Sequence, residues 1–145
     1  MKSNNTTQSK YDWVGDFKKG LAKVELHGKF GVINEKEEEV IPLKYDWIGH
    51  FINGFARVML NEKIGFINEA GKEITLQKYD LAWDFKNGFA VVMLNGKEGF
   101  INENGEEVIP LKYDDVFDFE NGLAMVVIDG RKTFINKKGE EIEKN

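Results

Sequence analysis

The chain has 145 residues, of which 41% are hydrophobic and 31% are charged, a balance typical of one globular domain rather than of a disordered or fibrous protein. The net charge of −5, with no evident basic stripe, argues against nucleic acid as a partner. The absence of cysteine excludes disulfides, zinc–thiolate sites and cysteine nucleophiles.

The first nine residues, MKSNNTTQS, are polar, and we expect residues 1–9 to form a flexible tail. They lack the apolar core of a signal peptide. No apolar run in the chain approaches the roughly 18 residues of a membrane span. We therefore expect no membrane insertion and a cytoplasmic location, an expectation that a removed leader would change.

After the tail, an octapeptide that begins with Lys-Tyr-Asp returns four times at a constant spacing of 34 residues. It reads KYDWVGDF at 10–17, KYDWIGHF at 44–51, KYDLAWDF at 78–85 and KYDDVFDF at 112–119. Other columns repeat without any insertion, beginning in the first copy with Gly20, Ala22, Val24 and Ile33-Asn34. The sequence thus predicts a single repeat domain at 10–145, with units at 11–44, 45–78, 79–112 and 113–145.

Each unit has the local patterns of short strands and tight turns. In the first unit GLAKVEL (20–26) alternates apolar and polar residues, which indicates a strand. His27-Gly28, like Asn95-Gly96 and Asp129-Gly130 in later copies, suits a two-residue type I′ turn into the next strand, KFGVIN (29–34). A second turn, in which Glu37 replaces the glycine of the other copies, leads to a third strand, EEVIP (38–42). A left-handed backbone at Glu37 would cost about 1–2 kcal/mol.

These elements predict an all-β fold. A 34-residue period is also that of the helical tetratricopeptide hairpin, but helix interiors tolerate poorly the glycines present in every unit. A propeller blade usually needs four strands and about 40–45 residues. We therefore expect about three strands per unit, with the units stacked as a β-solenoid or superhelix. The alternative is a closed ring, barrel-like or like a four-bladed propeller.

The columns Tyr-Asp, Phe-x-x-Gly-Leu/Phe-Ala and Gly-Lys-aromatic-Gly-aromatic-Ile-Asn resemble the bacterial WG-repeat family over residues 10–143. The signature Trp-Gly pair of that family maps onto Phe30-Gly31, Ile64-Gly65, Glu98-Gly99 and Lys132-Thr133. The resemblance implies an all-β repeat with no known catalytic machinery. A fainter similarity to choline-binding cell-wall repeats implies binding through aromatic residues between hairpins.

Catalytic constellations are absent from the sequence. The only serines, Ser3 and Ser9, lie in the tail, and the histidines, His27 and His50, lack the spacing of metal ligands. No phosphate-binding glycine loop occurs, and most carboxylates fall at predicted turns. We expect no catalytic residue, no metal and no cofactor, and hence no enzyme.

Two charged columns recur in every unit. The aspartates that follow the repeated tyrosine could contact a ligand, but capping of a turn is the favoured interpretation: Asp12, Asp46, Asp80 and Asp114. The cations after the hairpin turn could engage an anionic partner, although lysine near strand ends commonly guards against aggregation. They are Lys29, Lys63, Lys97 and Arg131.

Specificity is expected in the columns that vary between units. The outward face of the first long strand loses polarity along the chain and could present an apolar partner surface, or become buried, at Val91, Met93, Met125 and Val127. One large aromatic in each opening octapeptide changes position, and could fill the core or line a ligand groove: Trp13, Trp47, Trp83 and Phe117.

The sequence therefore predicts a non-catalytic repeat module with a protein-binding or scaffold surface, with self-association as one form of that binding. The alternative is a module that binds a carbohydrate or another cell-envelope ligand in an aromatic groove.

Overall fold

The computed structural model describes residues 10–142, which form four antiparallel sheets of four strands each. The tail expected at 1–9 lies outside the described residues. The sheets follow one another along the chain, and within each sheet the strands neighbour one another in sequence order. The all-β prediction is confirmed.

The first sheet contains β1 (Trp13–Val14), β2 (Leu21–Leu26), β3 (Lys29–Asn34) and β4 (Glu39–Tyr45). The second contains β5 (Trp47–Ile48), β6 (Phe55–Leu60), β7 (Lys63–Asn68) and β8 (Glu73–Tyr79). The third contains β9 (Leu81–Ala82), β10 (Phe89–Leu94), β11 (Lys97–Asn102) and β12 (Glu107–Tyr113). The fourth contains β13 (Asp115–Val116), β14 (Leu123–Ile128), β15 (Arg131–Asn136) and β16 (Glu141–Ile142).

The opening octapeptide supplies a fourth strand in each unit, where the sequence predicts about three. Trp13 and Val14 pair with Glu25 and Val24, and the equivalent two-residue strands pair in the same way in the other three sheets. A single residue, such as Asp46, separates the last strand of one sheet from the first strand of the next. Thirty-four residues therefore suffice for a four-stranded sheet, because the first strand and the link are so short.

The tight turns have the predicted conformation. Both central residues of the hairpin between β2 and β3, His27 and Gly28, have positive φ values of 54° and 82°, as a type I′ turn requires. Glu37 also adopts a left-handed conformation, with φ of 65°, where later units have glycine. The repeat geometry thus overrides the local preference of this glutamate.

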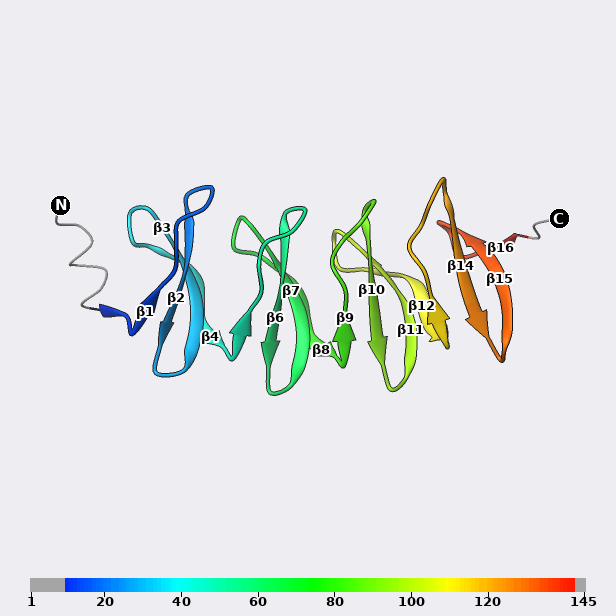
Figure 1. The fold of residues 1–145 in the computed structure, drawn as a ribbon, viewed down its shortest axis with the longest axis horizontal. Coiled ribbons are helices and arrows are strands. Elements are labelled where there is room, and N and C mark those ends of the chain that lie inside the picture. Colours follow the sequence, from blue (N-terminus) through cyan, green and yellow to red (C-terminus); the bar gives the residue numbers. More distant parts are fainter. Residues whose placement is uncertain (1–9, 143–145) are drawn as a thin grey trace.

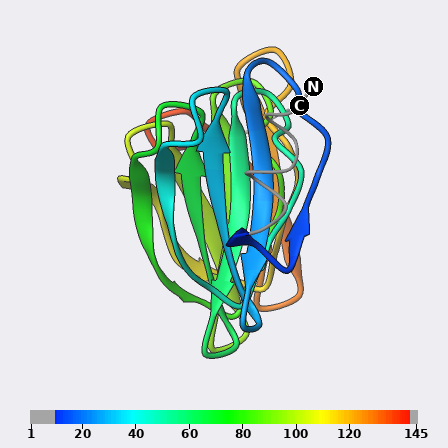
Figure 2. The same cartoon turned by 90° about the vertical axis from the view of Figure 1, so that its left-hand side faces the viewer.

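The four sheets stand side by side in an open row (Figure 1). In the end-on view the strands of successive sheets overlap, as expected for stacked units (Figure 2). The strands β1 and β16 lie at opposite ends of the row (Figure 1). The open stack is therefore the correct expectation, and the closed ring does not form.

Three of the four apolar clusters in the described chain span neighbouring units, and the fourth lies within the first unit. Val32 and Ile41 of the first unit pack with Tyr45, Ile48 and Val58 of the second, all at most 3% exposed. The later junctions have equivalent clusters. Each unit thus buries its apolar residues against its neighbours, which makes the stability of the row a property of adjacent pairs.

An ionic ladder links the units beside this core. Lys29 Nζ of the first unit lies 2.5 Å from Asp46 Oδ1 of the second, and the Lys97–Asp114 pair repeats the distance. Lys63 and Asp80 form the same contact. The other carboxylate oxygen of Asp46 accepts the backbone N–H of Asn61 at 2.9 Å. The capping interpretation of this aspartate column is confirmed, and the lysines before it are bound within the row.

Candidate functional site

Large apolar side chains are exposed in the opening octapeptide of every unit. Four of them are the aromatic residues singled out from the sequence, and each has 42–45% of its surface exposed: Trp13, Trp47, Trp83 and Phe117. Filling of the core therefore does not explain these residues. We call this set the aromatic edge.

The ring of the aromatic edge is carried two residues later in the third and fourth units than in the first two. Even so, each unit keeps a ring over the same part of its surface. A Cβ added at Gly15 would lie 2.9 Å from Trp13 Cη2, and one added at Gly49 would lie 2.7 Å from Trp47 Cη2. The indole thus covers the glycine two residues later. In the third unit that later position is Trp83, which carries the ring itself. A ring at both positions would collide, so each unit has one.

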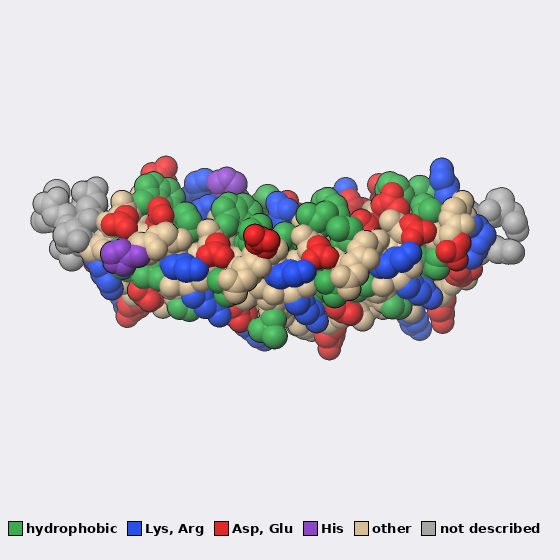
Figure 3. Space-filling view, turned by 90° about the horizontal axis from the view of Figure 1, so that it is seen from below, with side chains coloured by type: hydrophobic (Ala, Val, Ile, Leu, Met, Phe, Trp, Pro, Cys, Tyr) green, Lys and Arg blue, Asp and Glu red, His purple; other side chains and the backbone are tan. Residues whose placement is uncertain are grey.

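The space-filling view has hydrophobic side chains in separate groups along its upper edge, over successive units (Figure 3). Basic and acidic side chains mingle below them along the length of the molecule (Figure 3). An exposed apolar row beside a charged band is typical of a surface that binds a partner.

The second predicted surface is only partly exposed. Val91 is buried, with 7% of its surface exposed, and Met93, Met125 and Val127 are half-buried. At Val91 the lost polarity reflects contact with the next unit, since Val91 and Val116 belong to one cluster.

Pockets open at the junctions, under the aromatic edge. The pocket at the first junction has a volume of about 550 Å³, and Trp13, Leu21, Val32 and Phe51 are among the residues that line it. At the second junction the Phe85 ring packs 4.2 Å from Phe55 and 4.9 Å from Phe66, measured between ring centroids.

The first junction has smaller side chains at the two positions that Phe55 and Phe66 occupy in the second unit. Leu21 and Val32 stand there, and Phe51 is only half-buried whereas its equivalent Phe85 is 1% exposed. Underpacking of the first junction thus accounts for the pocket there.

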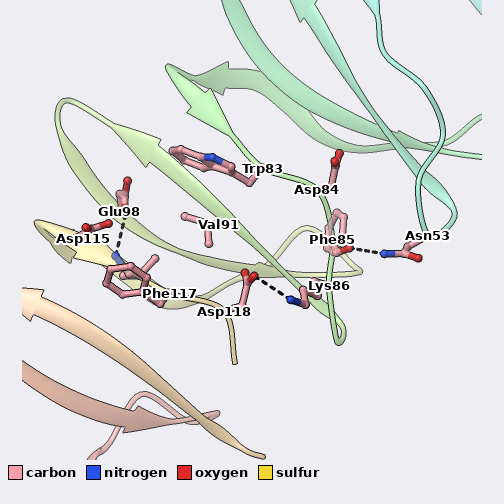
Figure 4. A pocket seen from close by; sticks show the side chains of 11 residues that line it. Asn53, Trp83, Asp84, Phe85, Lys86, Val91, Glu98, Asp115, Phe117 and Asp118 are labelled. Carbon is pink, nitrogen blue, oxygen red and sulfur yellow. Dashed lines mark hydrogen bonds and ion pairs between the residues drawn. The ribbon is translucent and has the colours of Figure 1, made fainter. Parts of the chain in front are cut away.

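The pocket at the third junction has a volume of about 470 Å³ and a different lining. Val91 lies at its centre, between the rings of Trp83 and Phe117 (Figure 4). The carboxylates of Glu98 and Asp115 lie together at one side (Figure 4).

Glu98 is the one acidic residue among the buried side chains of the described chain, with 9% of its surface exposed. Its Oε1 accepts the backbone N–H of Val116 at 2.9 Å. Burial raises the pKa of Glu98, and the adjacent Asp115 carboxylate adds to the rise, whereas the Val116 hydrogen bond opposes it. Two carboxylates in contact give this pocket a negative potential.

Among residues 10–142, no group of three or more possible metal ligands comes together. The described residues also contain no helix that is long and apolar enough to cross a membrane.

The sequence profile of the WG containing repeat family matches residues 4–30, 30–63, 64–97 and 99–131. The chain belongs to this family. The search of curated proteins found no match to this WG repeat chain. Among solved structures it is similar to Hsv2p of Kluyveromyces lactis, with 15% identity and a TM-score of 0.45 over 91% of this chain and 50% of the other. It is also similar to the extracellular domain of BT4673 of B. thetaiotaomicron, with 14% identity and a TM-score of 0.43 over 92% of this chain and 23% of the other.

The glycine of the WG signature has a clear structural cause. A Cβ at Gly99 would lie 2.3 Å from the Ile109 carbonyl oxygen, and Gly31 and Gly65 face carbonyl oxygens of the neighbouring strand at 2.6 and 2.7 Å. The register of the two strands shifts across this glycine and again after the residue that follows it. In the fourth WG repeat Thr133 takes the place of the glycine.

Sequence reasoning found the aromatic edge but missed Glu98 and the cations that cross the junctions. Lys23 Nζ lies 3.4 Å from the Ile48 carbonyl oxygen, and Arg57 Nη1 donates to the Ala82 carbonyl oxygen at 3.0 Å. The columns of Lys23 and Glu98 change polarity between WG repeats, which was a visible signal. That the two columns meet at one junction needed the three-dimensional structure.

Proposed function

We propose that this WG repeat chain is a non-catalytic module that binds an extended segment of a partner protein along the aromatic edge. The observation that carries the proposal is the half-exposed ring that every unit presents, at 42–45% exposure. Aromatic side chains with one face exposed and the other packed are typical anchors of binding surfaces.

The dimensions of the row suit an extended polypeptide. Stacked sheets lie about 10 Å apart, so the four rings span about 30 Å. An extended chain rises about 3.3 Å per residue and would cover this length with roughly nine residues. Side chains spaced about three residues apart along such a segment would reach successive junctions.

The charges beside the rings favour a polypeptide over a neutral sugar. In the first junction pocket Lys18, Lys19 and Lys23 outnumber two carboxylates, Asp16 and Glu69. In the third, four carboxylates, with Glu98 and Asp115 among them, outnumber one lysine. A segment with acidic residues toward one end and basic residues toward the other complements both pockets. The two pockets would also fix its direction.

Selection from a displayed library of random twelve-residue peptides tests this function. We expect the chain to enrich peptides with micromolar dissociation constants. A variant with all four rings of the aromatic edge replaced by alanine should bind these peptides at least tenfold more weakly. Leu76→Ala is the matched control, since Leu76 is 69% exposed on β8 outside the aromatic edge. Failure to enrich any peptide, or equal binding by the four-ring variant, would contradict the proposal.

A carbohydrate is the second candidate ligand, because exposed tryptophan rings over pockets of about 500 Å³ also suit stacking on a sugar. A glycan array probed with the chain and with the same four-ring variant distinguishes the two functions. Ring-dependent glycan binding without peptide enrichment would favour the sugar. Concentration-dependent dimerisation that the four-ring variant abolishes would identify a second copy of the chain as the partner.

A further inference from the structure

The first two junctions contain a cation supplied by the chain itself. Lys23 in the first unit and Arg57 in the second occupy the same column, and each reaches a backbone carbonyl of the next unit. Arg57 Nε also lies 3.4 Å from an Asp84 carboxylate oxygen. A positive head group therefore bridges each of these two junctions beside the aromatic edge.

At the third junction this cation is missing. Val91 takes the place of Lys23 and Arg57, and its side chain ends at the centre of the pocket (Figure 4). Glu98 replaces the Phe30 and Ile64 of the earlier units, and Asp115 replaces Trp47 and Leu81. Thus the junction that has lost its cation has gained two carboxylates.

The charges around this pocket leave the two carboxylates without a cation. Lys86 Nζ lies 3.5 Å from an Asp118 oxygen at the other side of the pocket, and Asp84 is paired with Arg57. Among residues 10–142, no lysine or arginine lies within ion-pair distance of Glu98 or Asp115.

We propose that the pocket between the third and fourth units binds the side chain of an arginine from the partner polypeptide, with its guanidinium against Glu98 and Asp115 and its flat face against Trp83 or Phe117. The inference deepens the proposed function by naming one residue of the bound segment. The arginine would take the place that Arg57 occupies at the second junction.

Arginine suits this pocket better than lysine for two reasons. Its planar guanidinium stacks on aromatic rings, and its fork of donors can satisfy two carboxylates together. An ammonium is a compact, strongly hydrated charge that gains less from a ring-lined wall. The pocket volume of about 470 Å³ also accommodates the long arginine side chain.

Binding of a cation should depend on pH in a defined direction. The charged groups that face the pocket are Glu98 from β11, Asp115 from β13 and Asp118 just after it, with Asp84 and Lys86 from the segment between β9 and β10. The pKa of Glu98 is raised, chiefly by burial. A guanidinium prefers the ionised pair, so arginine binding should strengthen as the pH rises through the pKa of Glu98.

Titration with three short peptides tests the proposal. The probes are N-acetyl-Gly-Arg-Gly-amide and its glutamine and lysine counterparts, and binding is followed by amide and indole shifts in ¹H–¹⁵N spectra of the whole chain. We expect saturable shifts at Trp83, Glu98 and Asp115 with the arginine peptide, and at least fivefold weaker binding of the glutamine peptide. The lysine peptide should bind with intermediate affinity, and the arginine peptide should bind more weakly at pH 5 than at pH 8.

Two variants keep the test independent of folding defects. Glu98→Gln should reduce affinity for the arginine peptide at least fivefold while keeping a similar shape. Val91→Arg should supply the cation internally, as Arg57 does, and abolish binding. Glu103→Gln removes one negative charge from an exposed turn and should bind as the wild type does.

Equal shifts with the arginine and glutamine peptides, or unchanged binding by both Glu98→Gln and Val91→Arg, would overturn the inference. The peptide selection tests the proposed function separately from the arginine pocket. If selected peptides depend on the aromatic edge but lack arginine, the binding module stands and the arginine pocket falls. If no peptide is selected but the arginine probe binds, the arginine pocket stands and the proposed binding module falls.

Discussion

Asp80 and Lys63 form an ion pair across the second junction, and the other oxygen of Asp80 accepts the backbone N–H of Asn95 at 2.9 Å. One carboxylate thus joins two units and caps a hairpin turn in the second of them. The Lys63 contact, with the Asn95 hydrogen bond second, holds the pKa of Asp80 below its ordinary value. Asp46 and Asp114 have equivalent contacts, and their pKa values are also lowered.

These aspartates predict a loss of stability in acid. A carboxyl group whose pKa is lower in the folded state stabilises the fold above its unfolded pKa, near 3.9, and this contribution disappears as the pH falls through the folded value. We expect the melting temperature to fall below about pH 4. Asp80→Asn should lower the melting temperature at pH 7 and reduce its change between pH 5 and pH 3. If the melting temperature of Asp80→Asn changes between pH 5 and pH 3 as much as that of the wild type, Asp80 does not have this role.

Packing at the first junction should improve with larger side chains. Val32→Phe and Leu21→Phe restore the residues that surround Phe85 at the second junction, and the adjoining pocket of about 550 Å³ has room for them. We expect the free energy of unfolding of the double variant, measured in urea, to be about 1–2 kcal/mol higher than that of the wild type, because the variant buries more apolar surface. The reverse change, Phe66→Val, should lower the free energy of unfolding by about 1–3 kcal/mol. Destabilisation by the double variant would show that the first junction cannot accept these rings.

The first junction could also be stabilised by a hydrogen bond that the other two junctions have. Asn53 Nδ2 donates to the Phe85 carbonyl oxygen at 2.7 Å, and Asn87 Nδ2 donates to that of Phe119 at 3.0 Å. Lys19 occupies this column in the first unit, with a left-handed φ of 54°. Lys19→Asn should therefore stabilise the chain by about 0.5–1 kcal/mol, through a new bond to Phe51 and a better turn residue. Lys19→Gln, which shares neither advantage, is the control in the same denaturant titration.

The signature glycine should tolerate no side chain where the neighbouring strand is close. Gly99→Ala places a Cβ 2.3 Å from the Ile109 carbonyl oxygen, so backbone must move. We expect a loss of about 2 kcal/mol or more in the free energy of unfolding. Thr133→Ala, in the same column of the fourth unit, should change it by less than about 1 kcal/mol. Similar losses in the two variants would contradict the close-approach explanation.

Exposure of the aromatic edge can be checked without a ligand. Trp13, Trp47 and Trp83 are each 42–45% exposed, so acrylamide should quench the fluorescence of the folded chain substantially. Single-tryptophan variants, with phenylalanine at the other two positions, should be quenched to a similar extent. A shielded tryptophan in any of them would remove that unit from the proposed surface.

The sequence by itself determined the number of units, their all-β character and their turns. Constant spacing in the sequence defines the repeat. Alternation of apolar and polar residues defines the strands, and residue pairs such as Asn95-Gly96 define the left-handed turns, because strands and turns depend on the local conformation of the backbone. The sequence also identified the rings of the aromatic edge, although it could not distinguish core filling from exposure.

The tertiary structure decided what lies between the units. Whether the row closes depends on how each sheet packs on the next, and the pairing of Lys63 with Asp80 depends on side chains 17 residues apart. Val91 and Glu98 belong to one unit and Asp115 to the next, so only the stacking of two sheets brings them to one pocket. Contacts across a junction follow from the relative placement of whole sheets, and no local pattern in the sequence encodes that placement.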